Sequence, residues 1–536
     1  MKFHHWLFIS FLLACICSCR NTEKQDKNLS VFRYNEAANI TSLDPAFARD
    51  QANIWAARQL YNGLLQLDDH LNILPCIAQR WEISSDGRVY TFHLRRDVYF
   101  HDDPVFPGAK GRRVTAGDFV YSFSRVTDPS VASPGSWIFN YVEKKNGRSS
   151  FLAPDDSTFV IRLSASFPPF TGLLTTIYCS VLPFEAINSY GTEFRSHPVG
   201  TGPFKFRMWK EGVKLVMVKN PAYFEFENHQ RLPYLDAVSV TFFSDKQTAF
   251  LEFLKKNLDF ISGIDPGYKD ELLTSDGKLR GKFEGRFKLI TQPYLNTEYF
   301  GFLVDSRDAV PENIRKAFNY AIDRKKMIRY LRNNIGTPGI YGMIPIGMPG
   351  FDSTHIYYDY DPVKARKLIM ESQNPAPVIT LSTTADYLDL CKFIQHQVGE
   401  VGIDMKIEIS PPAALKEMKA QAKLPFFRGS WIADYPDAEN YLSLFYSRNF
   451  CPQGPDYTHY SNPEYDKLFE KAMASVDDSE RISDYRKMER LMMEDAPVVI
   501  LYYDKVLRFV ANDVEGLGID PMNLLTLKRV KKIKSK

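Results

Sequence analysis

The run VVILYY at residues 498–503 is apolar or aromatic at every position, and it constrains the fold strongly. Such a run is typical of a strand that is buried on both faces of a sheet. A helix is predicted over 479–495, and it stops just before Pro497. A helix that leads into a doubly covered strand requires stacked layers of both element types, which indicates a mixed α/β fold.

Earlier parts of the chain support this class with alternating strand patterns. VYTFHLR at 89–95 follows the turn Ser85-Asp86-Gly87, which is a hairpin signal. Further strands are predicted at 204–210, 214–220 and 236–243. The segment 311–334 predicts one helix that starts at Pro311 and ends before Gly336. Its apolar stripe consists of Ile314, Ala317, Phe318, Ala321, Ile322, Ile328 and Leu331.

Length and charge limit the function classes. A chain of 536 residues with 44% hydrophobic residues can bury several cores and suggests roughly three domains. The net charge of +3 depends on a basic tail at 527–536, which holds six basic residues and no acidic one. Without this tail the chain is mildly acidic, which argues against a nucleic-acid partner. We expect the tail to be a frayed, solvated end.

The N-terminus has the pattern of an export signal. MKFHH is mildly basic, and the apolar run that follows is too short to span a membrane. Leu12-Leu13-Ala14-Cys15 fits the spacing of a bacterial lipobox, while a signal that ends at Cys19 has a more usual length. The pattern resembles a lipoprotein precursor, with residues 1–19 as signal and 20–29 as a polar tether; an ordinary secretory signal is the alternative.

Catalytic and metal-binding patterns are missing from the sequence. It contains no HExxH, GxSxG or GxxxxGK[ST] motif. We interpret His101-Asp102-Asp103 as turn residues at the end of a strand rather than a metal site. The cysteines after the signal, Cys76, Cys179, Cys391 and Cys451, lack metal-ligand spacing, and we assign no disulfide. We therefore predict no enzyme activity, no cofactor and no metal.

The stretch FRGSWIADYPDAENYL at 427–442 places Asp434 between Trp431 and Tyr435. Two interpretations fit the residues. The aromatic rings belong to the core and Asp434 caps a turn before Pro436, or Asp434 anchors a cation. Asp437 is better suited to cap the helix predicted at AENYL.

Several further blocks follow one another along the chain. They are SLDPA (42–46), LYNGLL (60–65), AQRWEISSDGRVYTFHLRRDVYFHD (78–102), VTAGDFVYSFSR (114–125), GTGPFKF (200–206), RKAFNYAIDR (315–324) and WIADYPDAENYL (431–442). Taken in this order, the blocks resemble the extracytoplasmic solute-binding proteins of the peptide/nickel family of ABC importers. The resemblance spans roughly residues 30–510, and one departure is the insertion DPVFPGAKGRR at 103–113, which we expect to be a surface loop.

The resemblance implies a two-lobed clamshell of the class II periplasmic-binding-protein type, with an additional inserted N-terminal domain. By analogy, the first lobe combines 30–60, 182–290 and 500–530. The inserted domain covers 61–181, and the second lobe covers 291–499.

The resemblance also implies a site. In oligopeptide-binding members, the aspartate of W-x-x-D-Y binds the α-ammonium of the peptide, and Asp434 holds this position beside Trp431 and Tyr435. Arg428 matches an arginine that meets the ligand carboxylate, and Lys419 lies where some members carry another cation. The backbone from Gly429 to Ala433 would hold the peptide main chain as an added strand.

The resemblance further implies a monomeric, lipid-anchored receptor in the periplasm or at the cell exterior. It would bind oligopeptides and deliver them to ABC permease subunits. Other ligands remain open, namely a dipeptide, muropeptide, nickel chelate, haem or oligosaccharide, because the fold does not fix the ligand. A surface adhesin or chaperone is a further alternative.

Overall fold

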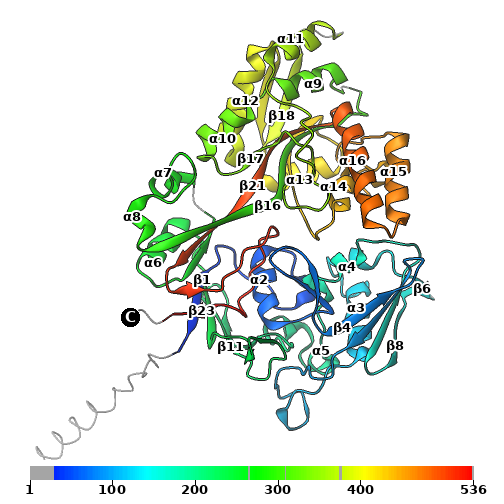
Figure 1. The fold of residues 1–536 in the computed structure, drawn as a ribbon, viewed down its shortest axis with the longest axis vertical. Helices are drawn as coiled ribbons and strands as arrows, with labels where there is room; N and C mark the ends of the chain where they lie inside the picture. The colour runs from blue at the N-terminus through cyan, green and yellow to red at the C-terminus, as the bar shows by residue number, and fades with distance from the viewer. Residues whose placement is uncertain (1–28, 146, 264–265, 308, 373–376, 534–536) are drawn as a thin grey trace, which may run out of the picture.

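One long mixed sheet runs through the computed structural model, which describes residues 29–533 except 146, 264–265, 308 and 373–376 (Figure 1). Within these residues the strand order is β10-β11-β14-β1-β15-β21-β16-β20-β18-β19, and β17 pairs with β21 outside this path. The fold class is α/β, as predicted. The strands are β1 (Val31–Asn35), β10 (Phe204–Lys210), β11 (Lys214–Lys219), β14 (Ala237–Thr241), β15 (Phe260–Ser262), β16 (Phe287–Phe302), β17 (Thr337–Pro338), β18 (Val378–Thr383), β19 (Asp404–Ile409), β20 (Phe426–Ile432) and β21 (Val498–Ala511).

The first half of the sheet is centred on β1, which lies parallel to both of its neighbours, β14 and β15. Phe32 and Tyr34 of β1 are buried, while Arg33 between them is exposed. Parallel strands end at the same edge, so the loops that follow β1 and β15 meet there. The helices of this half are α2 (Gln51–Leu60), α5 (Phe184–Tyr190), α6 (Lys246–Leu254), α7 (Lys269–Leu272) and α8 (Gly281–Glu284).

The long strands β16 and β21 connect the two halves of the molecule (Figure 1). They contain 16 and 14 residues and pair antiparallel over most of their length. The pairing is irregular between Pro293 and Thr297, where the strands pass from one half to the other. Residues 498–503 of β21 are all buried, which confirms the predicted doubly covered strand.

The second half contains β20, β18 and β19 and has a hydrophobic core of its own. Phe426 of β20 lies at the centre of this core, with ring centroids 5.5 Å from Phe300 and 5.2 Å from Phe318. The helices of this half are α9 (Glu312–Tyr320), α10 (Arg324–Arg332), α11 (Pro362–Met370), α12 (Leu388–Glu400), α13 (Pro412–Ala420), α14 (Glu439–Leu442), α15 (Pro463–Ala474) and α16 (Asp478–Asp495).

The prediction of a single helix over 311–334 is wrong, because the segment forms α9 and α10 with a break at 321–323. Asp323 caps the second helix by accepting the N–H of Lys326 at 2.9 Å. Arg324 is buried and donates to backbone carbonyls, including that of Asn319 at 2.9 Å. The break lets the chain bury this guanidinium with its donors satisfied, which a continuous helix would not allow.

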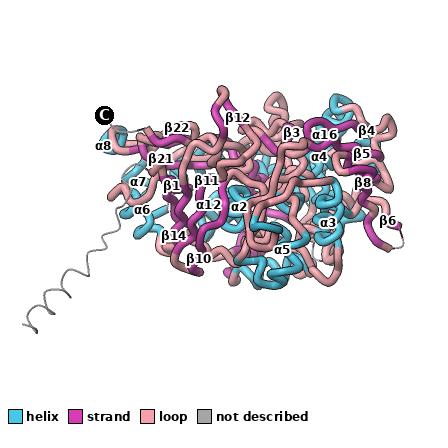
Figure 2. The backbone as a smooth tube through the Cα atoms, turned by 90° about the horizontal axis from the view of Figure 1, so that it is seen from below, coloured by secondary structure: helices cyan, strands magenta, loops and turns pink. Residues whose placement is uncertain are grey.

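Residues 61–181 contain a separate four-stranded sheet in the order β4-β5-β9-β8, at one end of the molecule (Figure 2). Helix α3 (Ala116–Thr127) packs on it through a cluster of rings, in which Phe123 lies 4.9 Å from Phe139 and 5.5 Å from Phe159. The strands are β4 (Ala78–Ile83), β5 (Val89–Leu94), β8 (Phe151–Asp155) and β9 (Thr158–Arg162). The short elements here are β2 (Leu65–Leu67), β3 (Ile73–Pro75), β6 (Lys144–Lys145), β7 (Arg148–Ser149) and α4 (Phe170–Leu173).

We propose the division of the chain implied by the resemblance: a first lobe of 30–60, 182–290 and 500–530, an inserted domain of 61–181, and a second lobe of 291–499. The grouping of strands supports this division. The lobes share one continuous sheet through β16 and β21, so the connection between them consists of two hydrogen-bonded strands.

The insertion at 103–113 is tied to its surroundings by polar and aromatic contacts. Asp102 accepts the N–H of Gly111 at 3.1 Å, and Arg112 donates to Asp118 at 2.7 Å. Phe106 is buried and stacks on Phe100 at 6.1 Å. The loop is therefore held in one place rather than hanging free.

The prediction of a frayed basic tail is wrong for residues 527–533. Lys528 is buried and forms an ion pair with Glu225, and Lys532 lies 2.7 Å from Asp259. The segment also forms the ribbon of β22 (Val514–Glu515) with β23 (Lys531–Lys532). Its acidic partners come from distant parts of the sequence, so the charge run alone could not reveal them.

The predicted signal region, tether and lipidated Cys15 or Cys19 lie outside the described residues, apart from Leu29 at the end of the tether. Within the described residues no helix is both long and apolar enough to span a bilayer. Cys76, Cys179, Cys391 and Cys451 are free and buried.

Candidate functional site

Strand β20 leads into the predicted site and has one open edge. It pairs along its length with β16, but it touches β18 only at Phe427. The N–H of Ala433, just after β20, donates to the carbonyl of Leu295 within β16. Because backbone direction alternates along a strand, the backbone groups of Ser430 and Ile432 point to the opposite edge. Among the described residues, no strand pairs with that edge beyond Phe427.

Asp434 follows this strand and has no cationic partner among the described residues. Within those residues, the only hydrogen bond of its carboxylate comes from Asn440, which donates from Nδ2 to Asp434 Oδ2 at 3.4 Å, a long distance for a hydrogen bond. Asp434 is exposed to solvent at the cavity, but protein surrounds it on its other sides, and the resulting loss of hydration raises the pKa of its carboxyl above the ordinary value. Such a group gains most from an incoming cation.

The space in front of Asp434 is a cavity of about 1070 Å³, including the part open to solvent. This size suits a small organic ligand. Its walls come from the first lobe, the inserted domain, the second lobe and the C-terminal segment. The lining residues are Arg49, Gln51, Ile54, Trp55, Arg58, Leu67, Trp137, Thr175, Thr176, Ile177, Tyr178, Tyr294, Ile432, Ala433, Asp434, Met522, Asn523 and Leu524.

Trp431 and Tyr435 hold the Asp434 turn in place. The indole N–H of Trp431 donates to Asn440 Oδ1 at 2.9 Å, and the same oxygen accepts the N–H of Asp434 at 3.2 Å. Tyr435 is buried, donates its hydroxyl to Glu439, and packs 6.2 Å from the ring of Trp137. Neither aromatic side chain lines the cavity, so both position the turn that carries Asp434 without themselves facing the ligand space.

The other predicted residues lie apart from the Asp434 cavity. Arg428 forms a buried ion pair with Glu298, and its guanidinium lies over the ring of Tyr387 at 3.5 Å. A Cβ at Gly429 would come within 2.6 Å of the ring of Tyr299, so glycine lets that ring pack against the strand.

Lys419 has no acidic partner among the described residues, and its ammonium lies over the ring of Tyr457 at 4.5 Å. Burial, together with nearby Arg428, lowers its pKa to about 8. The structure thus brings Trp431 and Tyr435 to Asp434 but leaves the two predicted cations elsewhere in the second lobe.

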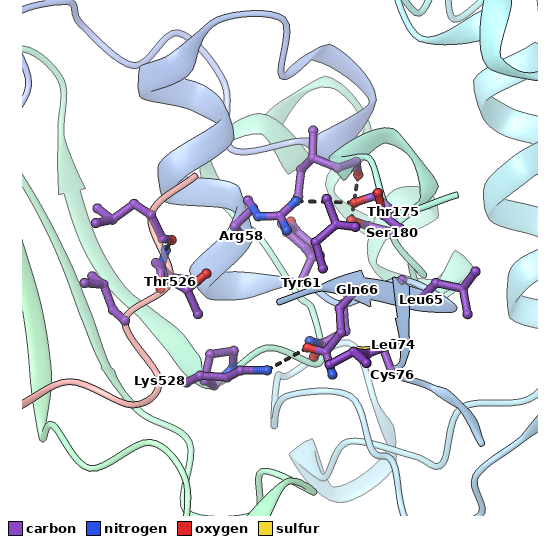
Figure 3. A pocket seen from close by; sticks show the side chains of 18 of the residues that line it. Arg58, Tyr61, Leu65, Gln66, Leu74, Cys76, Thr175, Ser180, Thr526 and Lys528 are labelled. Atoms are coloured by element: carbon purple, nitrogen blue, oxygen red, sulfur yellow. Dashed lines mark hydrogen bonds between the residues drawn. The ribbon is translucent and has the colours of Figure 1, made fainter. Parts of the chain in front are cut away.

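Two arginines that the sequence analysis missed lie closer to Asp434. Arg49 and Arg58 line the same cavity, and neither has an ion-pair partner among the described residues. Arg58 also lines a cavity toward Gln66 and Lys528, and its guanidinium donates to the carbonyl of Thr175 at 3.4 Å (Figure 3). Arg49 follows the SLDPA block by three residues, which is the only signal in the sequence that could have pointed to it.

His101, Asp102 and Asp103 are held by turn and loop contacts. His101 is buried with Nε2 3.0 Å from the carbonyl of Gly202, and burial lowers its pKa to about 4. Asp103 accepts the hydroxyl of Tyr190 at 2.8 Å. In the part of the chain that the structure describes, no group of three or more histidine, cysteine or acidic side chains could hold a metal ion.

Asp437 differs from Asp434 because its carboxylate is fully satisfied. It accepts the N–H of Glu439 at 2.9 Å, as expected of a residue at a helix start, and the hydroxyl of Tyr485 at 2.8 Å. It also pairs with Arg481 at 3.2 Å. It is therefore a structural carboxylate.

A cavity between lobes that share a two-strand connection, with one unpaired carboxylate at its wall, defines a protein that encloses a solute. The model of the family "Bacterial extracellular solute-binding proteins, family 5 Middle" matches residues 72–450. The chain belongs to this family of extracellular solute-binding proteins. It is a binding component for ABC import and not an enzyme, as predicted.

Individual relatives match along almost the whole chain. The glutathione-binding protein GsiB of Salmonella choleraesuis is 25% identical over 531 residues, covering 97% of this chain and 96% of that protein. The dipeptide-binding protein DppE of Bacillus subtilis is 25% identical over 530 residues, covering 93% and 91%.

Solved structures confirm the two-lobed fold. The periplasmic binding protein DppA from Helicobacter pylori, in complex with the peptide STSA, has a TM-score of 0.76 at 25% identity and covers 94% of this chain and 98% of its own. HbpA2 from Haemophilus parasuis has a TM-score of 0.81 at 21% identity, covering 94% and 99%. The predicted family and clamshell fold are thus confirmed.

Proposed function

We propose that this protein binds peptides by their free amino terminus in the Asp434 cavity and delivers them to an ABC permease. The observation that carries the proposal is the carboxylate of Asp434, which faces the cavity and has no cation beside it among the described residues. A peptide α-ammonium would supply that charge. A charge-assisted hydrogen bond of this type contributes about 1.5–3 kcal/mol.

The open edge of β20 supports the second part of the proposal. The backbone groups of Ser430 and Ile432 are turned toward that edge, immediately before Asp434. An extended peptide could add to the sheet there through main-chain hydrogen bonds, which carry affinity without reading side chains. Asp434 would then fix the register by holding the first residue.

The C-terminal carboxylate of a bound peptide would be stabilised by a cation, and two groups of basic residues are candidates. We retain Arg428 and Lys419 as proposed contacts, although Glu298 already occupies Arg428. Arg58 is the competing candidate, because it lines the same cavity as Asp434 and lacks an ion-pair partner among the described residues. Its planar guanidinium suits bidentate binding of a carboxylate.

The location follows from the sequence pattern. We propose that the protein is a monomer outside the cytoplasm, anchored by a lipid on Cys15 or Cys19, so that it stays close to its permease. The names of the relatives include glutathione, a dipeptide and the peptide STSA. These names favour short peptides over the other solutes. Mass spectrometry of molecules that copurify with the protein would identify the length of the bound peptide.

Isothermal titration tests the amine clamp directly. Tri- to pentapeptides would be titrated in free and N-acetylated form against the wild type, Asp434→Asn and the surface control Asp386→Asn. We expect the free form to bind at least ~10-fold more tightly to the wild type and to the control, since 1.4 kcal/mol corresponds to a factor of ten. Asp434→Asn should remove this difference. Equal affinity of both peptide forms for the wild type would refute the proposal.

A further inference from the structure

A second cavity adjoins the Asp434 cavity inside the first lobe. It measures about 990 Å³, including the part open to solvent, and it shares Gln51 and Trp55 with the first cavity. Asn35 at the end of β1, Glu36 directly after it, and Ser262 and Gly263 at the end of β15 line this cavity. Both strands end there in the same direction, and the carboxyl ends of parallel strands are where α/β proteins bind ligands.

Glu36 is the unusual residue of this cavity. Its Oε1 atom is buried and has no hydrogen-bond partner, and no cation forms an ion pair with it among the described residues. Burial, and then the charge of nearby Asp50, raises the pKa of Glu36 to about 8. An orphaned buried carboxyl oxygen destabilises the free protein, so its presence in a ligand-accessible wall calls for a partner that arrives from outside.

The charged and titratable groups around Glu36 do not neutralise it. Asp50 adds negative charge, and its own carboxylate is engaged with Asn53 at the start of α2. Lys246 on α6 lines the cavity but is exposed and makes no ion pair among the described residues. The hydroxyls of Tyr34 and Tyr268 belong to neighbouring elements and carry no positive charge. The field at Glu36 therefore favours an added cation.

The remaining walls are apolar, and four aromatic side chains contribute to them. Trp55, Phe250, Tyr268 and Phe509 come from α2, α6, the segment before α7, and β21, and Ala249, Ile261 and Leu272 add aliphatic surface. Flat apolar rings suit the methylene stem of a long cationic side chain, and ring faces attract its charged end. An aliphatic or aromatic ligand group would satisfy the rings but would leave Glu36 unpaired.

We propose that this second cavity is a subsite for a basic side chain, a lysine ammonium or an arginine guanidinium, carried by the bound peptide. Its aromatic walls hold the stem, and Glu36 receives the charged head. This inference rests on the proposed peptide function and narrows it to basic peptides, because the subsite shares Gln51 and Trp55 with the cavity where Asp434 would hold the amino terminus.

The test removes one charge from the ligand and, separately, one charge from the protein. The ligands are variants of trialanine in which one alanine, at position one, two or three, is replaced. The replacement is either lysine or norleucine, which has a similar length but no charge. Each is titrated against the wild type, Glu36→Gln and the control Glu211→Gln, which alters an exposed glutamate outside both cavities. We expect lysine at one position to bind about 10-fold more tightly than norleucine, which corresponds to a charged hydrogen bond of about 1.5 kcal/mol.

The preference for lysine should disappear in Glu36→Gln and persist in Glu211→Gln. It should also increase from pH 6 to pH 8, because a cation binds the ionised carboxylate and displaces its proton. Wild-type protein that binds the lysine and norleucine peptides equally at all three positions would overturn the subsite while leaving peptide binding intact.

A separate probe distinguishes failure of the subsite from failure of the proposed function. Nα-acetyl-lysine methylamide has the basic side chain but no α-ammonium, so it does not depend on Asp434. If no peptide binds, but this probe binds the wild type and not Glu36→Gln, the peptide function is refuted and the subsite stands. If neither the peptides nor the probe bind, both are refuted.

Discussion

Asp434 and Asp437 show how two carboxylates three positions apart acquire different roles. Asp437 forms an ion pair with Arg481 and accepts a hydrogen bond from Tyr485, both on α16 and more than 40 positions away in the sequence. Among the described residues, the carboxylate of Asp434 has only a long hydrogen bond from the amide of Asn440. The local pattern could suggest that Asp437 starts a helix, but only the tertiary structure shows which aspartate remains unpaired.

A first prediction concerns the stability of the ligand-free protein at Asp434. Burial raises the pKa of its carboxyl in the folded state, so folding takes up a proton and stability increases as the pH falls through that pKa. At neutral pH the ionised group opposes folding. Asp434→Asn should therefore raise the melting temperature slightly, by about 1–2 °C at pH 7, and this gain should shrink toward acidic pH.

Thermal unfolding of Asp437→Asn supplies the matched comparison. This change removes the buried one of two acidic partners of Arg481, which also pairs with the exposed Asp478 at 2.7 Å, and should lower stability by about 1–3 kcal/mol. If both substitutions destabilise the ligand-free protein to the same degree, Asp434 is a structural residue like its neighbour.

At the scale of elements, the sequence predicts where strands lie better than it predicts helix breaks or which strands pair with each other. The run 498–503 and the strand at 204–210 were recovered because their patterns are local. The break between α9 and α10 was missed, although Asp323 has the residue type of a helix cap. The open edge of β20 could not be predicted from the sequence, because it depends on the register with β16, some 130 positions earlier.

The C-terminal segment offers a second prediction. Lys528 and Glu225 form a buried pair, and Gln66 accepts a further hydrogen bond from the same ammonium at 2.7 Å (Figure 3). Lys528→Met would leave Glu225 buried without its cation. We expect a loss of about 3–5 kcal/mol in the free energy of unfolding, measured by denaturant titration.

An exposed ion pair supplies the control, because replacing its lysine should hardly change the free energy of unfolding. Lys278 lies 3.0 Å from Asp276, and its side chain is 80% exposed. Lys278→Met should change the free energy of unfolding by less than about 1 kcal/mol. Equal effects of the two substitutions would restore the interpretation of the C-terminus as a solvated tail.

At the scale of the whole molecule, the division into lobes came from the family resemblance and not from composition or periodicity. The first lobe is assembled from three separated stretches, and β16 and β21 join both halves into one sheet. Such long-range pairing leaves no local trace in the sequence. The cavity walls have the same origin, which explains why Asp434 was found through a motif while Trp137, Arg58 and Glu36 were missed.

Closure of the molecule on its ligand can be followed at Trp137. This residue belongs to the inserted domain, and its ring lies 6.2 Å from Tyr435 of the second lobe, beside the Asp434 cavity. A ligand that contacts both walls stabilises the arrangement in which these rings meet, because it binds that arrangement more tightly than an open one. Peptide addition should therefore change the emission of Trp137, so the change should be smaller in Trp137→Phe than in the wild type; Trp55, which also lines the cavity, supplies part of the remainder. Trp209→Phe, altered on β10 outside both cavities, should retain the full change; if Trp137→Phe also retains the full change, the inserted domain and the second lobe do not close together over the ligand.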